Sequence, residues 1–326
     1  MKTRQFGNTG LQVSELIIGA GAIGGLFINA DETTRRAALQ SALAAGINWI
    51  DTAASYGQGR SEQALGSLLA ELGSAREQPY LSTKFSVDPD QLNDLAGQIE
   101  ASVTASLNRL QRTSVTLLQL HNPLAHATDS KRLAISEVLK PGGVLDVMQD
   151  LKRQGLCDHI GLTGLGEADC IIQALDTAQF ESAQVYYNLL NPSAGQAMPA
   201  DYTGARFDGV LAACERNQVA PMAIRIMSAG VIATDSRHGR EAPLTAGDTV
   251  ASETEKAARI AAALGDRYGS RAQAAVRFVL GEPRFACLVV GFEKIDYLNE
   301  AIAAQKMGAL PAQASAQIQA VYDAGF

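Results

Sequence analysis

The sequence predicts an α/β protein built as a closed (β/α)8 TIM barrel, and three observations support this class. Short apolar runs alternate with amphipathic segments along the whole chain of 326 residues. Eight such pairs occur, and strict alternation of strand and helix implies a parallel sheet. Composition does not change between the two halves, so we predict one domain over residues 1–326. An open, doubly wound parallel sheet is the alternative.

Each predicted strand is a short, mostly apolar run, as expected for strands that are buried on both faces. In chain order the runs are Glu15–Ala20, Ile47–Asp51, Tyr80–Lys84, Val115–His121, His159–Thr163, Ala183–Tyr187, Pro221–Ile226 and Ala286–Val290. One helical segment follows each run. These segments are Glu32–Ala45, Ser61–Leu72, Asp90–Leu110, Val144–Gln154, Glu167–Ala178, Phe207–Asn217, Glu253–Tyr268 and Lys294–Gln305. Asp31 can cap the first of these helices and Gly46 can end it.

Three segments depart from the plain repeat. Lys2–Val13 predicts an N-terminal β-hairpin that could cover the bottom of the barrel, with Asn8-Thr9-Gly10 as its turn. Met227–Val250 is a loop long enough to serve as a functional flap. Gln313–Tyr322 predicts an extra C-terminal helix.

Composition and charge argue against several functions. The formal net charge is −7 with Lys and Arg scattered, so neither nucleic acid nor a membrane is an expected partner. No apolar segment suits a secretory signal or a bilayer span, which predicts a cytoplasmic protein. The four cysteines show no metal-ligand spacing with each other or with histidine, so we expect reduced, buried thiols and no metal site. They are Cys157, Cys170, Cys214 and Cys287.

Two motifs suggest other enzymes but have the wrong context. Gly19–Gly24 reads G-x-G-x-x-G after a strand, as in dinucleotide-binding folds. In those folds the glycines open directly into a helix, whereas residues 25–30 intervene here before the cap at Asp31. Tyr80 and Lys84 have the spacing of a short-chain dehydrogenase pair. On a strand, however, they would lie about 13 Å apart, which excludes cooperation.

Asp51, Lys84 and His121 each end one of three consecutive predicted strands. The C-terminal ends of parallel barrel strands share one face, so these side chains should converge on one mouth. Tyr56 lies on the loop after Asp51. Each residue alone could be structural. A titratable group ends each of three consecutive apolar runs, however, and burying such a group carries a desolvation penalty unless it is paired. Together they predict a catalytic centre.

The motifs around these residues resemble the aldo-keto reductase family. Asp51–Gly57, Ser82–Lys84 and Leu120–Pro123 carry the resemblance, which covers nearly the whole chain. Phe6–Ser14, Ile160–Thr163 and Gln184–Asn188 resemble that family at matching places. The resemblance implies that Tyr56 protonates the substrate carbonyl and that His121 orients it. It also implies that Lys84, held by Asp51, lowers the pKa of the tyrosine.

The family resemblance further implies a nicotinamide dinucleotide across the mouth. Its binding residues would be Asp51, Thr163, Gly164, Gln184, Met227, Ser228, Gly230, Gly291, Glu293 and Lys294. Thr163 and Gln184 would hold the carboxamide, and backbone N–H groups of the later loops would hold the phosphates. NADP(H) is the expected cofactor, but Glu293 would repel a 2′-phosphate and Lys294 would attract it, so NAD(H) is the alternative.

We therefore expect a reductase of an aldehyde or ketone, or the reverse dehydrogenase, acting on a small-molecule substrate. An aromatic content of 6% weakly favours a small or polar, sugar-like carbonyl compound. A nucleotide-sensing regulatory subunit on the same barrel is the alternative, because fold does not fix function. A Schiff-base enzyme using Lys84 is a third hypothesis, disfavoured by Asp51 and Tyr56 in their motif.

Overall fold

Eight parallel strands close into a barrel in the computed structural model, in the order β10-β11-β12-β3-β4-β5-β6-β9. The strands are β3 (Leu16–Gly19), β4 (Trp49–Asp51), β5 (Tyr80–Phe85), β6 (Val115–Leu120), β9 (Cys157–Gly164), β10 (Ser182–Tyr186), β11 (Ala220–Ile224) and β12 (Cys287–Gly291). Each predicted strand overlaps one of them. The structure describes residues 1–21, 23–73, 78–237, 239, 241, 243 and 248–325. Closure confirms the (β/α)8 prediction and excludes the open sheet.

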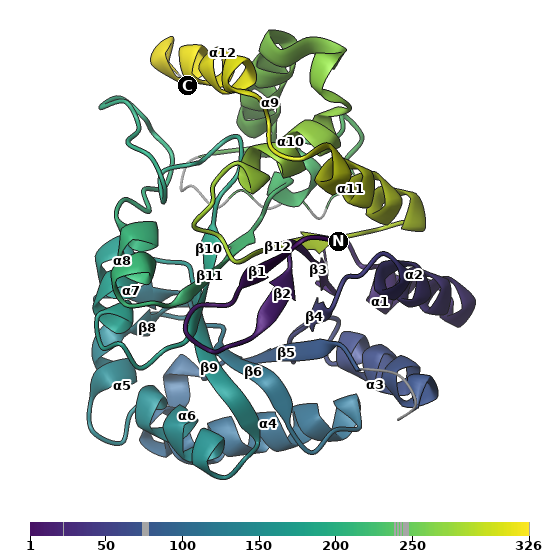
Figure 1. Ribbon diagram of the computed structural model, residues 1–326. Coiled ribbons are helices and arrows are strands. Elements are labelled where there is room, and N and C mark those ends of the chain that lie inside the picture. The colour runs from purple at the N-terminus through teal and green to yellow at the C-terminus, as the bar shows by residue number, and fades with distance from the viewer. Residues whose placement is uncertain are drawn as a thin grey trace.

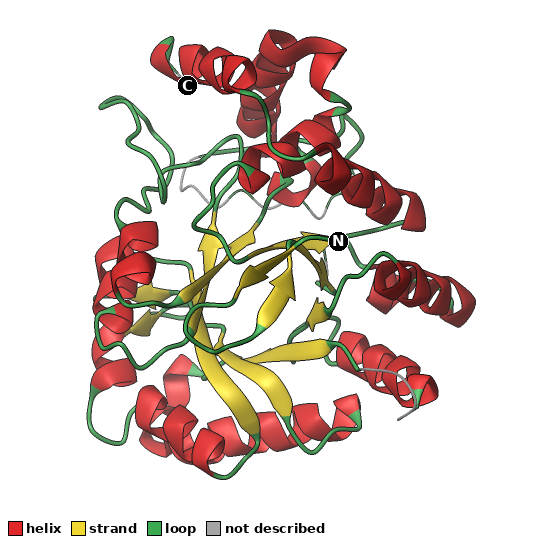
Figure 2. Cartoon of the chain, in the orientation of Figure 1, coloured by secondary structure: helices red, strands yellow, loops and turns green. Residues whose placement is uncertain are grey.

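Helices surround the strands on the outside of the barrel (Figure 2). The longer ones are α2 (Glu32–Ala44), α3 (Arg60–Leu72), α4 (Leu95–Leu110), α6 (Val144–Arg153), α7 (Ala168–Leu175), α8 (Val210–Arg216), α9 (Val250–Leu264), α10 (Arg271–Leu280), α11 (Ile295–Met307) and α12 (Ala312–Asp323). Shorter turns are α1 (Leu26–Asn29), α5 (Ile135–Leu139), η1 (Pro89–Asp94), η2 (Ser228–Gly230) and η3 (Gly265–Tyr268). Asp31 caps α2 as expected, accepting from the Thr34 N–H at 2.8 Å.

Three helix predictions were wrong in detail. The segment 90–110 divides into η1 and α4, because the Asp94 side chain accepts from the Gly97 N–H and starts a new helix. The short helix α1, which begins directly after Gly25, was not predicted. Two helices, α9 and α10, follow β11, whereas the sequence predicted only the first. A reciprocal capping box between Ser270 and Gln273 marks the start of α10.

The N-terminal hairpin closes the bottom of the barrel. Strand β1 (Thr3–Gln5) pairs antiparallel with β2 (Gln12–Ser14), drawn in purple in Figure 1. Phe6, which is completely buried, packs on Trp49 with ring centroids 4.7 Å apart. The predicted extra helix is α12, whose Tyr322 hydroxyl donates to the Leu189 carbonyl at 2.8 Å. Part of the predicted loop 227–250 lies outside the described residues.

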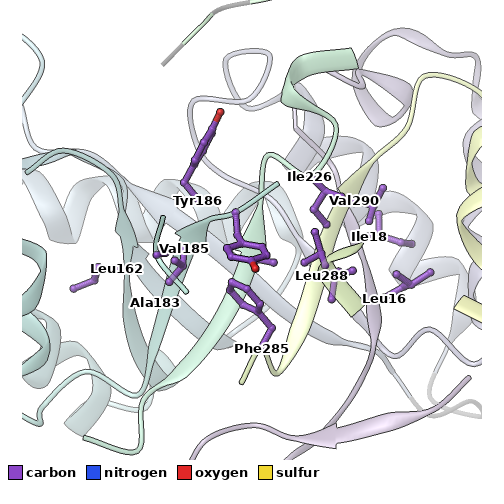
Figure 3. Packing of buried hydrophobic residues seen from close by; sticks show 14 of the residues in the cluster. Leu16, Ile18, Leu162, Ala183, Val185, Tyr186, Ile226, Phe285, Leu288 and Val290 are labelled. Atoms are coloured by element: carbon purple, nitrogen blue, oxygen red, sulfur yellow. The ribbon is translucent and has the colours of Figure 1, made fainter. Parts of the chain in front are cut away.

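Alternation along each strand separates two apolar layers. One set packs between the strands and the outer helices, and Figure 3 shows Ile18, Val185 and Leu288 among it. The other set, which includes Ile17 and Trp49, fills the bottom of the barrel interior. The polar side chains described below lie above this second layer and face the mouth. Among the described residues, no helix has the length and apolar character needed to cross a bilayer.

Candidate active site

The structure brings the four predicted catalytic residues together at the mouth. Asp51 ends β4, Lys84 lies in β5, and His121 directly follows β6. The Lys84 ammonium donates to Asp51 Oδ2 at 2.5 Å and to the Tyr56 hydroxyl at 3.3 Å. The rings of Tyr56 and His121 meet edge to face with centroids 5.6 Å apart. Asp51 and Lys84 are buried, whereas the two rings are partly exposed and can reach a ligand.

Asp51 accepts hydrogen bonds from four side chains. Its Oδ2 accepts from Lys84, and its Oδ1 accepts from three neutral donors. These donors are Ser82 Oγ at 2.7 Å, Gln184 Nε2 at 2.9 Å and Gln119 Nε2 at 3.1 Å. The carboxylate is therefore fixed from several strands, and one oxygen is left for the lysine.

A second set of residues lies one layer deeper and was not predicted. The Trp49 indole N–H donates to Ser82 Oγ at 2.9 Å, and Ser82 donates in turn to Asp51. Trp49, Ser82 and Gln119 each precede a predicted catalytic residue by two positions. Side chains two residues apart on a strand point to the same face, so this spacing was the available signal.

Burial and charge set the ionisation of the centre. Burial opposes the charge of Lys84, but Asp51 and Tyr56 together outweigh it and raise the lysine pKa. Burial and the Lys84 cation lower the pKa of His121 to about 4. At neutral pH the site thus combines a charged ammonium with a neutral imidazole. Ser55 Oγ lies 3.4 Å from His121 Nδ1, and a bond from the hydroxyl would leave Nε2–H for a ligand.

The glycine motif at residues 19–24 lines the site instead of opening a dinucleotide-binding helix. A Cβ on Gly21 would lie 3.7 Å from the Tyr56 ring. A Cβ on Gly24 would lie 2.5 Å from the backbone nitrogen of Phe292, which is in the loop after β12. Glycine is required at this second position because two loops meet there backbone to backbone. The Tyr80 and Lys84 pair is also excluded, since Tyr80 packs on Trp49 at the bottom end of β5.

Most of the predicted cofactor residues end or follow barrel strands at the mouth, whereas Thr163 and Gln184 lie within β9 and β10. Gly164 ends β9 and Gly291 ends β12, while Met227 precedes η2 and Lys294 precedes α11. Gln184, expected to hold a carboxamide, donates to Asp51 in this structure. Thr163 Oγ1 is buried and has no hydrogen-bond partner among the described residues.

The loop after β11 differs from the expectation. The N–H groups of Ser228 and Gly230, expected to face phosphate, donate instead to the carbonyls of Arg225 and Met227. The Ser228 hydroxyl donates to Glu253 Oε2 of α9 at 2.9 Å. In this conformation the loop is therefore closed by its own hydrogen bonds.

Among the described residues, His126 and His159 pair with acidic side chains rather than with the catalytic centre. His159 Nδ1 lies 3.1 Å from Glu181 Oε1. His126 contacts acidic side chains at the rim. His238 lies outside the described residues. All four cysteines are buried free thiols, as predicted.

Comparisons with known proteins agree with the barrel fold. The model of the Aldo/keto reductase family matches residues 15–323. L-galactose dehydrogenase of Arabidopsis thaliana is 32% identical over 165 residues, which are 51% of this chain and 49% of that protein. D-threo-aldose 1-dehydrogenase of a Pseudomonas species is 27% identical over 319 residues, 89% of each chain.

A further relative and a solved structure are also similar to this chain. A probable voltage-gated potassium channel subunit beta of Arabidopsis thaliana is 32% identical over 126 residues, 38% of each chain. An aldo-keto reductase structure from Bacillus halodurans in its holo form superposes with a TM-score of 0.76 at 22% identity, covering 99% of this chain and 96% of that one. The family model covers nearly the whole chain, with its matched region including every strand of the barrel, so the chain belongs to the aldo/keto reductase family.

Proposed function

We propose that the protein is an NAD(P)(H)-dependent oxidoreductase that reduces an aldehyde or ketone, or oxidises the matching alcohol. The observation that carries the proposal is the position of the Lys84 ammonium, which bonds to both Asp51 Oδ2 and the Tyr56 hydroxyl. This arrangement places a proton donor and a cation that stabilises its conjugate base beside an open mouth.

Tyr56 transfers its proton to the carbonyl oxygen of the substrate. The ammonium of Lys84, 3.3 Å from the phenol oxygen, stabilises the phenolate that remains. Asp51 keeps the ammonium in place and charged. Neutral His121 donates an N–H to the same oxygen, which orients the substrate and stabilises developing negative charge. A bound nicotinamide would supply or accept the hydride at the carbonyl carbon.

The residues at the mouth fit a nicotinamide dinucleotide. Thr163 Oγ1 is a buried hydroxyl oxygen that lacks a partner among the described residues, and a carboxamide could satisfy it. Gln184 can hold the same group if it exchanges its bond to Asp51. We propose NADP(H) as the cofactor and NAD(H) as the alternative, because Glu293 and Lys294 have opposite effects on a 2′-phosphate. Fluorescence titration with NADPH and NADH side by side distinguishes the two.

The substrate class follows from the relatives. Two of them are named as dehydrogenases of sugars, L-galactose and D-threo-aldose. Gly21 borders the Tyr56 ring and adds no side chain beside the phenol. We propose a sugar or sugar-like carbonyl compound as the substrate.

A regulatory, nucleotide-sensing role is the second candidate. The similarity to a potassium channel subunit over 126 residues favours it. The two functions separate on turnover: a sensor binds cofactor tightly but does not oxidise it with any carbonyl compound of a broad panel.

Tyr56→Phe tests the proposed mechanism. We expect kcat to fall about 10²-fold or more, because the phenol proton is removed, while cofactor affinity stays unchanged. Tyr80→Phe is the matched control, since this tyrosine lies at the opposite end of β5 from Lys84. Full turnover by Tyr56→Phe would refute the assignment.

A further inference from the structure

A second cluster of ligating side chains lies at the rim, apart from the catalytic centre. His126 follows the short strand β7 (Leu124–Ala125), whereas Glu167, Asp169 and Cys170 lie at the start of α7. One ligand atom from each of the four residues lies within 4.8 Å of the others. No sequence spacing reveals the cluster, because His126 and Glu167 are separated by 41 positions.

Each carboxylate accepts a hydrogen bond through one oxygen and faces His126 through the other, and Glu167 Oε2 also accepts from the His126 backbone N–H at 3.1 Å. Glu167 Oε1 accepts from Arg132 at 3.1 Å, and its Oε2 lies 3.5 Å from His126 Nε2 and 3.9 Å from Cys170 Sγ. Asp169 Oδ1 accepts from the Cys170 N–H at 3.0 Å, and its Oδ2 lies 2.7 Å from His126 Nε2. Outer hydrogen bonds that orient ligands in this way are typical of metal sites.

Two of the separations between ligand atoms approach those around a tetrahedral ion, and a third, from His126 Nε2 to Asp169 Oδ2, is shorter at 2.7 Å. Bonds from Zn²⁺ to nitrogen, oxygen and sulfur of about 2.0–2.3 Å place ligands about 3.3–3.8 Å apart. The contacts of Glu167 Oε2, at 3.5 and 3.9 Å, lie close to this range. The short contact between Asp169 and His126 widens by turning the imidazole, whose side chain is 61% exposed.

We propose that His126, Glu167, Asp169 and Cys170 bind one divalent cation of the zinc class. A thiolate and an imidazole favour zinc over magnesium or calcium, which prefer ligand sets made only of oxygen. Two carboxylates and a thiolate supply the negative charge, and the thiol proton passes to solvent when the ion binds.

The ion would join two segments that flank the mouth. The Leu124 N–H donates to the Leu165 carbonyl at 2.8 Å, so the chain after β6 already runs beside the chain after β9. His126 extends the first segment and α7 continues the second. Bound zinc would therefore brace the rim between His121 and Thr163 without touching either residue, and this holds whether or not the barrel reduces carbonyl compounds.

The test is metal binding by the purified, chelator-treated full chain. We expect one Zn²⁺ per chain in competition with a chromophoric chelator, and a thiolate-to-metal absorption band with Co²⁺. Cys170→Ser and His126→Ala should each weaken Zn²⁺ binding by about 10-fold or more, because even loss of an outer partner costs that much. Cys214→Ser, which alters a buried thiol on α8, should leave affinity unchanged.

His126→Ala should fold normally, since the His126 side chain is largely exposed, so a loss of zinc binding in this variant is not caused by misfolding. Failure of the wild-type chain to bind zinc stoichiometrically would overturn the proposal. Equal affinity of Cys170→Ser and Cys214→Ser would do the same.

Discussion

We predict that removing Asp51 and removing Lys84, which form a buried ion pair, destabilise the fold by different amounts. Their side chains are 2% and 0% exposed, so removing either charge leaves the other in a medium of low polarity. Without Lys84, the carboxylate still accepts from Ser82, Gln119 and Gln184. Without the carboxylate, the ammonium keeps only neutral acceptors. Loss of the carboxylate should therefore cost more.

The magnitudes follow from these partners. Breaking a buried pair from one side costs about 3–5 kcal/mol, and we assign about 4 kcal/mol to Asp51→Asn. Its amide N–H group would also face the ammonium or displace one of the three donors. Lys84→Met should cost about 2 kcal/mol, because hydrogen bonds to a charged group recover part of the loss. The double variant should cost less than the sum of the two single variants.

Urea unfolding of the wild type, the two single variants and the double variant at pH 7, followed by circular dichroism, measures these free energies of unfolding. A matched pair, Lys152→Met and Glu181→Gln at a more exposed ion pair, should show much smaller effects. Equal costs for the two single variants, or strict additivity, would refute the view that three neutral donors support the carboxylate.

Two further predictions concern pH and packing. The pKa of His121 is lowered from 6.5 to about 4, so its contribution of about 3 kcal/mol is complete above pH 6.5 and is lost as the pH falls toward 4. Unfolding curves at pH 7, 5.5 and 4 should show a loss about 3 kcal/mol larger in the wild type than in His121→Leu, because carboxylates with lowered pKa, such as Glu181, weaken both proteins in acid. Gly24→Ala should destabilise the fold by about 1–3 kcal/mol and weaken NADPH binding, because the new Cβ would collide with the backbone of Phe292. Unchanged Tm and affinity would contradict the close contact.

The sequence predicted the strands and the convergence of Asp51, Lys84 and His121 at one mouth, because both signals are local. Buried apolar runs identify the strands, and parallel topology alone brings Asp51, Lys84 and His121 to one face. The start of α10 carried a readable capping signal, Ser270-x-x-Gln273, but a second helix after one strand contradicts the plain repeat.

Other features depend on distant contacts that no local pattern encodes. The bond from Gln184 to Asp51 joins residues 133 positions apart. The N–H groups of Ser228 and Gly230 were expected to face phosphate, but their direction depends on the turn geometry of η2. The rim cluster at His126 is of the same kind, since its ligands meet only after β6 and β9 are neighbours.

The hydrogen-bond chain from Trp49 through Ser82 to Asp51 has a consequence for how such barrels diversify. Asp51 and Lys84 are supported from the closed end, where Phe6 packs on the indole, whereas Tyr56 stands on the loop after β4 and His121 directly follows β6. Natural variation or deliberate exchange of the other loops at the open end can therefore reshape the pocket for a new substrate while the proton-transfer groups stay in place. The N-terminal hairpin, at the opposite end of the barrel from these groups, is a segment that such redesign should leave untouched.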